Sequence, residues 1–251
     1  MDTVPEKLSN PISLRAIILI LSIVLGFHFL VNFIEDTDLL VYGFSLIIPG
    51  SVSIFSFIVA RKYSDSLVFS RSYYFLAFGF ASLFLAELTY LIYDLFLGID
   101  PYPSIADVFF FIFYPMISLF VFKHIQFFSS PTSISDKIIL GIIPVAITTL
   151  YLSITISEEF NFDFFYGILF VSATSISFAL SIYALKIFQG SLVGTSWIIM
   201  VAGILILVGG DIWYYYIELF EEYTLSHTVN VFWYLGYLVI LYSLIKHRSS
   251  L

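Results

Sequence analysis

Long apolar segments alternate with short polar segments along this chain. Eight stretches are almost wholly apolar, at positions 14–34, 39–60, 72–97, 105–122, 138–156, 164–185, 195–219 and 228–245. An α-helix of about 20 apolar residues crosses a hydrocarbon core of about 30 Å. Barrel strands would instead show short segments of alternating polarity. The pattern therefore predicts an all-α, polytopic membrane protein with eight transmembrane helices.

The basic residues mark one side of this expected bundle. They fall at the ends of the chain and in alternate loops, as Lys7, Arg15, Arg61, Lys62, Arg71, Lys123, Lys137, Lys186, Lys246 and Arg248. The other loops carry acidic residues, namely Glu35, Asp36, Asp38, Asp100, Glu158, Glu159, Asp163, Glu221 and Glu222. Loops rich in Lys and Arg resist translocation and stay in the cytoplasm. We therefore expect both termini in the cytoplasm and a multi-pass location in the cell membrane.

The composition narrows the class of function. Apolar residues make up 60% of the chain and charged residues only 11%, so the lipid bilayer is the main expected partner. The net charge of −8 and the lack of a basic stripe argue against nucleic acid as a partner. The absence of cysteine excludes disulfides, thiolate metal sites and a cysteine nucleophile. No hydrolase, zinc or phosphate-loop motif occurs, so we expect no enzymatic activity, cofactor or metal.

Two halves of the chain match each other in register. A shift of 124 pairs Glu35/Glu159, Tyr42/Tyr166, Gly43/Gly167, Lys62/Lys186, Gly79/Gly203, Glu87/Asp211, Tyr90/Tyr214 and Asp94/Glu218. After the loss of one residue, a shift of 123 pairs Asp107/Asn230, Tyr114/Tyr237 and Lys123-His124/Lys246-His247. We therefore expect a tandem 4+4 parallel repeat, with one four-helix unit at 1–127 and another at 128–251. A pseudo-twofold axis along the membrane normal would relate them.

Acidic side chains inside two spans are the first candidates for function. They form the triplets Glu87, Tyr90, Asp94 and Asp211, Tyr214, Glu218. Offsets of three and seven place each triplet on one face of an α-helix. Apart from Arg15 at the start of the first span, no Lys or Arg lies within a span to neutralise these acids, and ionisable residues at membrane depth usually mark function. They would be protonated, hydrogen-bonded to tyrosine or water, or bound to a cation; alternatively, they only hold the bundle together.

A second polar pattern recurs in the last span of each half. Asp107 and Tyr114 lie one heptad apart, and Asn230 and Tyr237 repeat that spacing. Ser104 and Asp107 also have capping-box spacing, so a helix cap is an alternative role for Asp107. His124 and His247 close the same spans, at helix ends where positive charge suits the dipole.

The segment Pro103-Ser104-Ile105-Ala106-Asp107-Val108-Phe109-Phe110, followed by Tyr114-Pro115, resembles a known signature. It is similar to the P-S-x-A-D-x-x-(Y/F)…Y-P pattern of multi-pass N-terminal membrane sensor regions of prokaryotic signalling proteins. Such regions precede diguanylate cyclase or histidine kinase domains. The resemblance implies a sensory input module. The chain ends at Leu251 with no output domain, so signalling would require a cytoplasmic or membrane partner.

Together these patterns predict an outward-facing, acidic and tyrosine-lined crevice between the two repeats. It would bind a small ligand or cation through Glu87, Tyr90, Asp94, Asp107, Tyr114, Asp211, Tyr214, Glu218, Asn230 and Tyr237. Two alternatives stay open. The same acids would serve a proton- or cation-coupled transporter of small solutes, or the chain would be a structural subunit of a membrane complex.

Overall fold

A computed structural model describes residues 12–35, 37–128, 133–156, 160–189, 195–221 and 223–249. Within these ranges the chain forms helices α1 (Leu14–Phe33), α2 (Asp38–Lys62), α3 (Leu67–Leu91), α4 (Ile105–Phe128), α5 (Ile134–Thr155), α6 (Phe162–Gln189), α7 (Thr195–Ile217) and α8 (Val229–Ser249). A π-helical segment, η2 (Ile92–Leu97), extends α3. The described ranges contain no strand.

Eight helices in this part of the chain are long and apolar enough to cross a membrane. The prediction of an all-α, multi-pass membrane protein is confirmed. Some residues used in the charge and repeat arguments lie outside the described residues, namely Lys7, Asp36, Glu158, Glu159 and Glu222. The linker residues 129–132 that join the two expected repeats, and the chain end at Leu251, also lie outside them.

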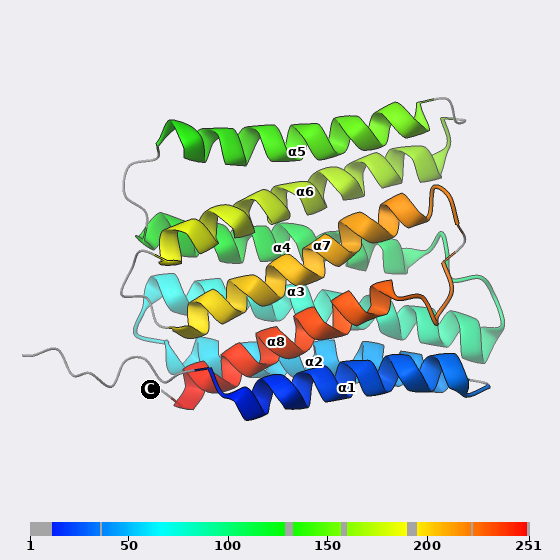
Figure 1. The fold of residues 1–251 in the computed structure, drawn as a ribbon, viewed down its shortest axis with the longest axis horizontal. Coiled ribbons are helices and arrows are strands. Elements are labelled where there is room, and N and C mark those ends of the chain that lie inside the picture. The colour runs from blue at the N-terminus through cyan, green and yellow to red at the C-terminus, as the bar shows by residue number, and fades with distance from the viewer. Residues whose placement is uncertain are drawn as a thin grey trace, which may run out of the picture.

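The helices run side by side and alternate in direction (Figure 1). The start of α1 and the end of α8 lie at the same end of the bundle, on the left in Figure 1. Arg15, Arg61, Arg71, Lys123 and Lys186 belong to helix termini at this end, which we call the basic end. The opposite end holds the α3–α4 and α7–α8 loops, and we call it the acidic end.

Six helices close into a ring. Each helix contacts the next one in the order α2, α3, α4, α6, α7 and α8, and α8 in turn contacts α2. Helix α1 packs against α8 from outside, and α5 packs against α6. The apolar windows of α1 and α5 are each only 17% buried, against 56% for α7. The ring therefore carries the core, and the two peripheral helices present most of their apolar surface to lipid.

Glycines bring α7 and α8 unusually close. A Cβ on Gly236 would lie 2.8 Å from the Leu207 Cβ, and one on Gly210 would lie 2.9 Å from the Phe232 Cβ. Membrane helices associate largely through such close packing of small residues. Gly210 therefore places its neighbour Asp211 directly beside α8.

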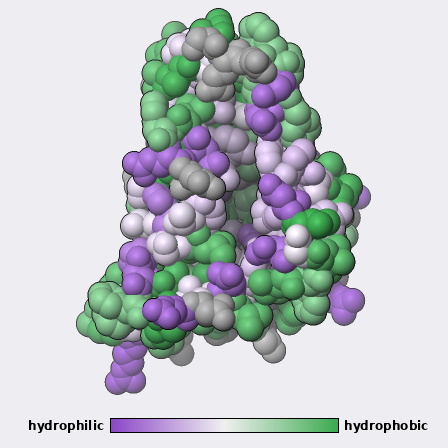
Figure 2. All heavy atoms as spheres, turned by 90° about the vertical axis from the view of Figure 1, so that its right-hand side faces the viewer, coloured by the Kyte–Doolittle hydropathy of each residue, from purple (hydrophilic) through white to green (hydrophobic). Residues whose placement is uncertain are grey.

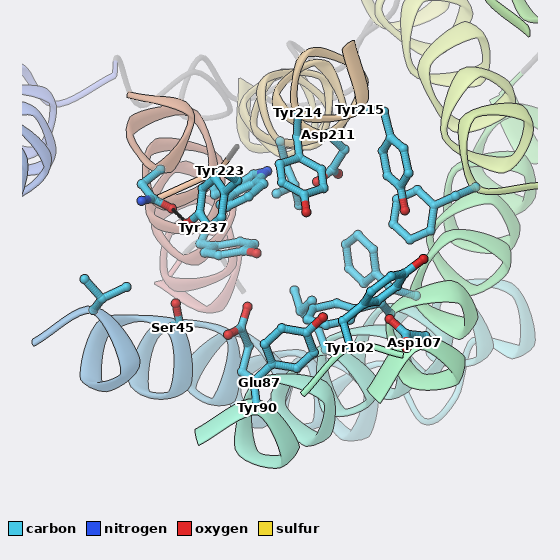
Figure 3. A pocket seen from close by; sticks show the side chains of 18 of the residues that line it. Ser45, Glu87, Tyr90, Tyr102, Asp107, Asp211, Tyr214, Tyr215, Tyr223 and Tyr237 are labelled. Carbon is cyan, nitrogen blue, oxygen red and sulfur yellow. Dashed lines mark hydrogen bonds between the residues drawn. The ribbon is translucent and has the colours of Figure 1, made fainter. Parts of the chain in front are cut away.

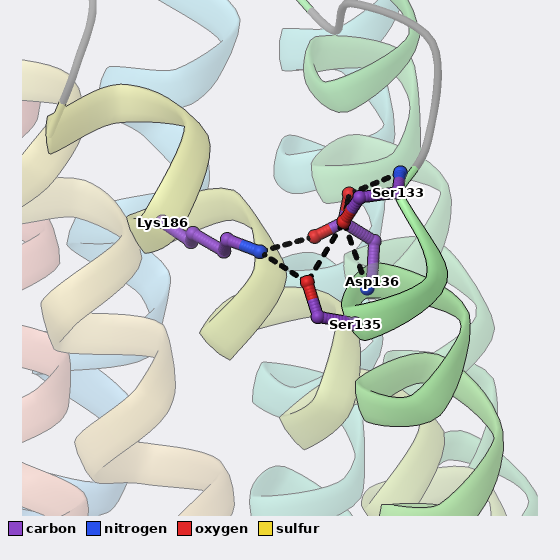
Figure 4. Close-up of polar contacts among 4 residues, drawn as sticks. All are labelled: Ser133, Ser135, Asp136 and Lys186. Atoms are coloured by element: carbon purple, nitrogen blue, oxygen red, sulfur yellow. Dashed lines mark hydrogen bonds and ion pairs between the residues drawn. The ribbon is translucent and has the colours of Figure 1, made fainter.

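A polar network joins α5 to α6 at the basic end (Figure 4). The Lys186 Nζ lies 2.5 Å from the Asp136 Oδ1 and 3.0 Å from the Ser135 Oγ. The Asp136 Oδ2 accepts from the Ser133 backbone N–H at 2.7 Å, which completes a capping box at the start of α5. This network ties the otherwise lipid-exposed α5 to the ring.

An aromatic cluster fills the ring at the basic end. The Trp197 ring centroid lies 4.0 Å from that of His124, 4.8 Å from that of His247 and 5.7 Å from that of Tyr73. His124 is 1% exposed and His247 5% exposed. Neighbouring helices therefore cover both rings, so neither imidazole lies at an exposed helix end. We call Tyr73, His124, Trp197 and His247 the basal cluster.

Candidate functional site

A cavity of about 170 Å³ lies inside the six-helix ring, toward the acidic end. Viewed from that end, the molecule is hollowed at its centre, and hydrophilic side chains surround the hollow (Figure 2). All six ring helices and two loops contribute to the wall. The lining residues are Val41, Tyr42, Ser45, Leu83, Glu87, Tyr90, Tyr102, Asp107, Phe110, Phe113, Tyr114, Tyr166, Phe170, Leu207, Asp211, Tyr214, Tyr215, Tyr223, Leu225, Asn230, Trp233 and Tyr237.

Two carboxyl groups enter this cavity from opposite walls (Figure 3). Glu87 comes from α3 and Asp211 from α7, so one acid belongs to each half of the chain. Among the residues that the structure describes, no Lys, Arg or His lines the cavity. The structure thus brings the two deepest predicted acids to one shared space without a basic partner.

The surroundings of Asp211 are well defined. The Tyr114 hydroxyl and the Trp233 indole N–H lie beside its carboxyl group. Even so, the Asp211 Oδ2 and the Trp233 Nε1 are both buried without a hydrogen-bond partner in the described part of the chain. A buried acceptor and a buried donor without partners are both costly. The arrangement therefore leaves unused hydrogen-bonding capacity in the wall of the cavity.

The predicted tyrosines lie in the same wall. Tyr90 on α3, Tyr214 on α7, Tyr114 on α4 and Tyr237 on α8 all line the cavity. Their rings are braced edge to face by other rings: Tyr90 lies 5.4 Å from Phe110, and Tyr214 lies 5.3 Å from Tyr215. Edge-to-face contacts hold aromatic walls in defined orientations.

Asp107 lines the cavity, and one of its carboxylate oxygens serves the chain itself. Its Oδ2 accepts from the Ser104 backbone N–H at 2.6 Å, and the Ser104 Oγ accepts from the Ala106 N–H at 3.1 Å. This is the helix-capping role weighed for it from its spacing.

Asn230 serves its own half of the chain in a similar way. Its Nδ2 donates to the Leu225 carbonyl at 2.7 Å, and its Oδ1 accepts from the Tyr223 hydroxyl at 2.9 Å. Asp107 and Asn230 therefore shape the cavity rim by holding the two loops that cover it.

Asp94 and Glu218, the shallower acid of each triplet, are not among the residues that line the cavity. Asp94 falls in the π-helical η2, whose wider turn shifts its side chain off the α-helical face. Its Oδ2 accepts from the Tyr42 hydroxyl at 2.7 Å. Glu218 follows the end of α7, and its Oε1 accepts from the Tyr223 N–H at 3.0 Å.

The sequence interpretation missed further aromatic residues of the wall. Tyr42 and Tyr166 recur at the 124-residue shift, which is a signal that could have placed them here. Tyr102 and Tyr223 come from loops, where no helical periodicity points inward. Burial raises the pKa of both hydroxyls above the usual tyrosine range, helped for Tyr102 by its 2.7 Å hydrogen bond to Asp163. Both therefore stay neutral donors at physiological pH.

The described residues contain no group of three or more His, Cys, Asp or Glu side chains placed to hold a metal ion. No protein-family model, curated protein or solved structure matches the chain. The resemblance of residues 103–115 to membrane sensor regions therefore stays an expectation.

Proposed function

We propose that this protein is a membrane ligand-binding module of the sensory type. Its cavity would face outward and take up a small ligand, and a partner at the cytoplasmic side would respond to the bound state. The observation that carries the proposal is one cavity shared by Glu87 and Asp211, each from a different half of the chain. Concave sites with a few convergent polar groups are the usual places for ligand binding.

The charges support an outward-facing cavity. The helix termini of the basic end carry Arg61, Arg71, Lys123 and Lys186, whereas the loops of the acidic end contain Asp100. Under the positive-inside rule, the basic end belongs in the cytoplasm. Both termini would then be cytoplasmic, and the cavity would open to the outside of the cell membrane.

The lining supports a tandem 4+4 repeat. The two shifts in the sequence relate sixteen of the 22 lining residues as eight pairs. These are Tyr42/Tyr166, Leu83/Leu207, Glu87/Asp211, Tyr90/Tyr214, Tyr102/Leu225, Asp107/Asn230, Phe110/Trp233 and Tyr114/Tyr237. The contacts between α2 and α8 and between α4 and α6 have the same relation. A cavity on the pseudo-twofold axis of two repeats accounts for this pairing.

The basal cluster favours sensing over transport as the first function to test. Its aromatic side chains occupy the interior of the helix bundle on the side away from the cavity, and the ring centroids of Trp197 and His124 are only 4.0 Å apart. A transporter would have to separate these rings in every cycle to expose the site to the cytoplasm. The resemblance of residues 103–115 to sensor regions points the same way.

Thermal unfolding in nanodiscs with a panel of small compounds tests the proposal. A binder at 100 times its dissociation constant should stabilise the protein by about 2.7 kcal/mol. Leu83→Phe would fill the cavity and should abolish the shift, with Leu207→Phe as an independent second filler. Leu85→Phe is the matched control, because Leu85 lies on the same helix and is 42% exposed. The proposal fails if no compound stabilises the protein, or if both fillers respond like the control.

The alternative functions have their own readouts. A proton- or cation-coupled transporter predicts solute flux into proteoliposomes that is lost in Glu87→Gln. Saturable binding without flux supports the sensor. A structural subunit predicts co-purification with fixed partner chains and no binding defect in Glu87→Gln.

A further inference from the structure

The charges around the cavity select the sign of the ligand. Glu87 and Asp211 project into it from opposite walls, Asp107 lines its rim, and no basic side chain among the described residues lines it. An anion would meet two carboxyls and no counter-charge, which makes its entry unfavourable. A cation would compensate acids that otherwise stay without a base at membrane depth.

An unused acceptor selects the kind of cation. The Asp211 Oδ2 is buried and has no hydrogen-bond partner in the described residues, although the Tyr114 hydroxyl and the Trp233 indole lie beside the carboxyl. A ligand N–H can satisfy this oxygen directly. A quaternary ammonium has no N–H and would leave it without a partner.

The aromatic walls favour a ligand that has a hydrocarbon part. Tyr90, Phe110, Tyr214 and Trp233 line the cavity with aromatic rings, three of which also carry a hydroxyl or an indole N–H. Aromatic faces attract organic cations through their electron-rich centres and also contact the hydrocarbon part of such ligands. A bare metal ion would lack ligands, since the described residues bring no three acids or histidines together.

The volume limits the size of the ligand. The cavity measures about 170 Å³. A closed, apolar cavity of about 150 Å³ is large enough for benzene. A compact ligand with few rotatable bonds therefore fits, and a long polyamine or a peptide does not fit inside.

We propose that the ligand is a compact organic ammonium ion with at least one N–H, which donates to Asp211 while Glu87 balances its charge from the opposite wall. The inference rests on the proposed function, because it names the ligand class for the same cavity. Tyr90, Tyr214 and Trp233 would enclose its hydrocarbon body.

Three probes of matched shape test the inference: tert-butylammonium, tetramethylammonium and tert-butanol. The first carries charge and N–H groups, the second only charge, and the third only a neutral hydroxyl. Binding to the full chain in nanodiscs can be followed by saturation-transfer NMR and by calorimetry. We expect tert-butylammonium to bind at least about ten-fold more tightly than either of the others.

Isosteric variants connect this preference to the two acids. Asp211→Asn should remove the advantage of tert-butylammonium over tetramethylammonium, because the amide replaces the charged acceptor. Glu87→Gln should weaken both cations and leave tert-butanol unchanged. Asp94→Asn is the matched control. Asp94 lies in η2, which extends the helix that carries Glu87, but it is not a lining residue of the cavity, and an asparagine there keeps an acceptor for the Tyr42 hydroxyl. It should bind all three probes as the unmodified chain does.

The possible failures are distinguishable. If tert-butanol or another neutral compound binds as tightly, and Leu83→Phe blocks it, the proposed binding function stands and the ammonium assignment is wrong. Equal binding of tetramethylammonium and tert-butylammonium overturns the role of the N–H. Absence of any probe binding that depends on the cavity overturns the ammonium assignment as well.

Discussion

The interior of the helix ring is hollow at one end and packed with side chains at the other. At the acidic end, Glu87 on α3 and Asp211 on α7 face a cavity. Fourteen residues earlier on each helix, Tyr73 and Trp197 meet in the basal cluster with their ring centroids 5.7 Å apart. Fourteen residues are about 21 Å of helix, so the hollow and the packed regions are separated by most of a membrane thickness.

The difference shows what decides whether the middle of a helix ring is filled. Rings without formal charge fill the space between helices, because close packing is favourable at any depth. Carboxyl groups resist such packing, since a buried charge needs a counter-charge, water or a ligand. We therefore expect the basal cluster to contribute stability and the cavity to contribute binding, and the following changes test that division.

The largest expected effect is on stability at the basal cluster. Trp197→Ala would leave a void among His124, His247 and Tyr73, and such truncations cost about 3–5 kcal/mol in a packed core. Unfolding in mixed detergent would measure it. Trp213→Ala is the control. Trp213 is 38% exposed, so its truncation should lower the free energy of unfolding much less. Equal losses at the two tryptophans would contradict a dominant role for the basal cluster.

At the cavity, the expected change is in binding and not in folding. Asp211→Asn should reduce binding of tert-butylammonium by at least about ten-fold, because the charge that the ligand neutralises is gone. Its free energy of unfolding should stay equal or rise, since a buried acid without a base is replaced by an amide. Glu218→Gln, outside the cavity, should change neither quantity. A large loss of stability in Asp211→Asn would assign this acid to the fold instead of to the site.

A smaller effect is expected at the loop that covers the cavity. Asn230→Ala removes the hydrogen bonds to the Leu225 carbonyl and from the Tyr223 hydroxyl. Each is worth about 0.5–1.5 kcal/mol. Faster amide hydrogen exchange at 223–229 with little change in α3 would show a local loosening. Ser226→Ala in the same loop is the control, and equal exchange in both variants would argue against Asn230 as the anchor.

The smallest effect is expected at the α5–α6 network. The Lys186 side chain is 49% exposed, so solvent screens its ion pair with Asp136. Lys186→Met should lower the unfolding midpoint only slightly, and less at high salt than at low salt. Asp136→Asn keeps an acceptor for the Ser133 cap and should behave similarly. A loss as large as that of Trp197→Ala would make α5 part of the folding core.

Particular residues show how far sequence patterns reach into this molecule. Runs of apolar residues were enough to predict the eight helices, because a bilayer accepts only backbones that satisfy their own hydrogen bonds. Helical periodicity also led to Glu87, Tyr90, Asp211 and Tyr214, which the cavity contains. Asp94, which the same periodicity placed on this face, lies in the π-helical η2 and is not among the residues that line the cavity.

Other features depend on contacts between distant segments. Asp107 and Asn230 were predicted as ligand-binding residues, yet the Asp107 Oδ2 accepts from the Ser104 N–H and the Asn230 Oδ1 accepts from the Tyr223 hydroxyl. His124 and His247 lie near helix ends in the sequence, and packing of neighbouring helices buries both rings.

The sequence by itself determined the helical membrane class, the number of spans and the segregation of charge to opposite loops. Each of these follows from local hydropathy and charge, which act on a segment whatever its neighbours are. Only the tertiary structure decided that α2, α3, α4, α6, α7 and α8 close into a ring while α1 and α5 stay outside. It also decided that the ring is hollow around Glu87 and Asp211 and filled around Trp197, because the shape and packing of side chains from different helices set the space between them.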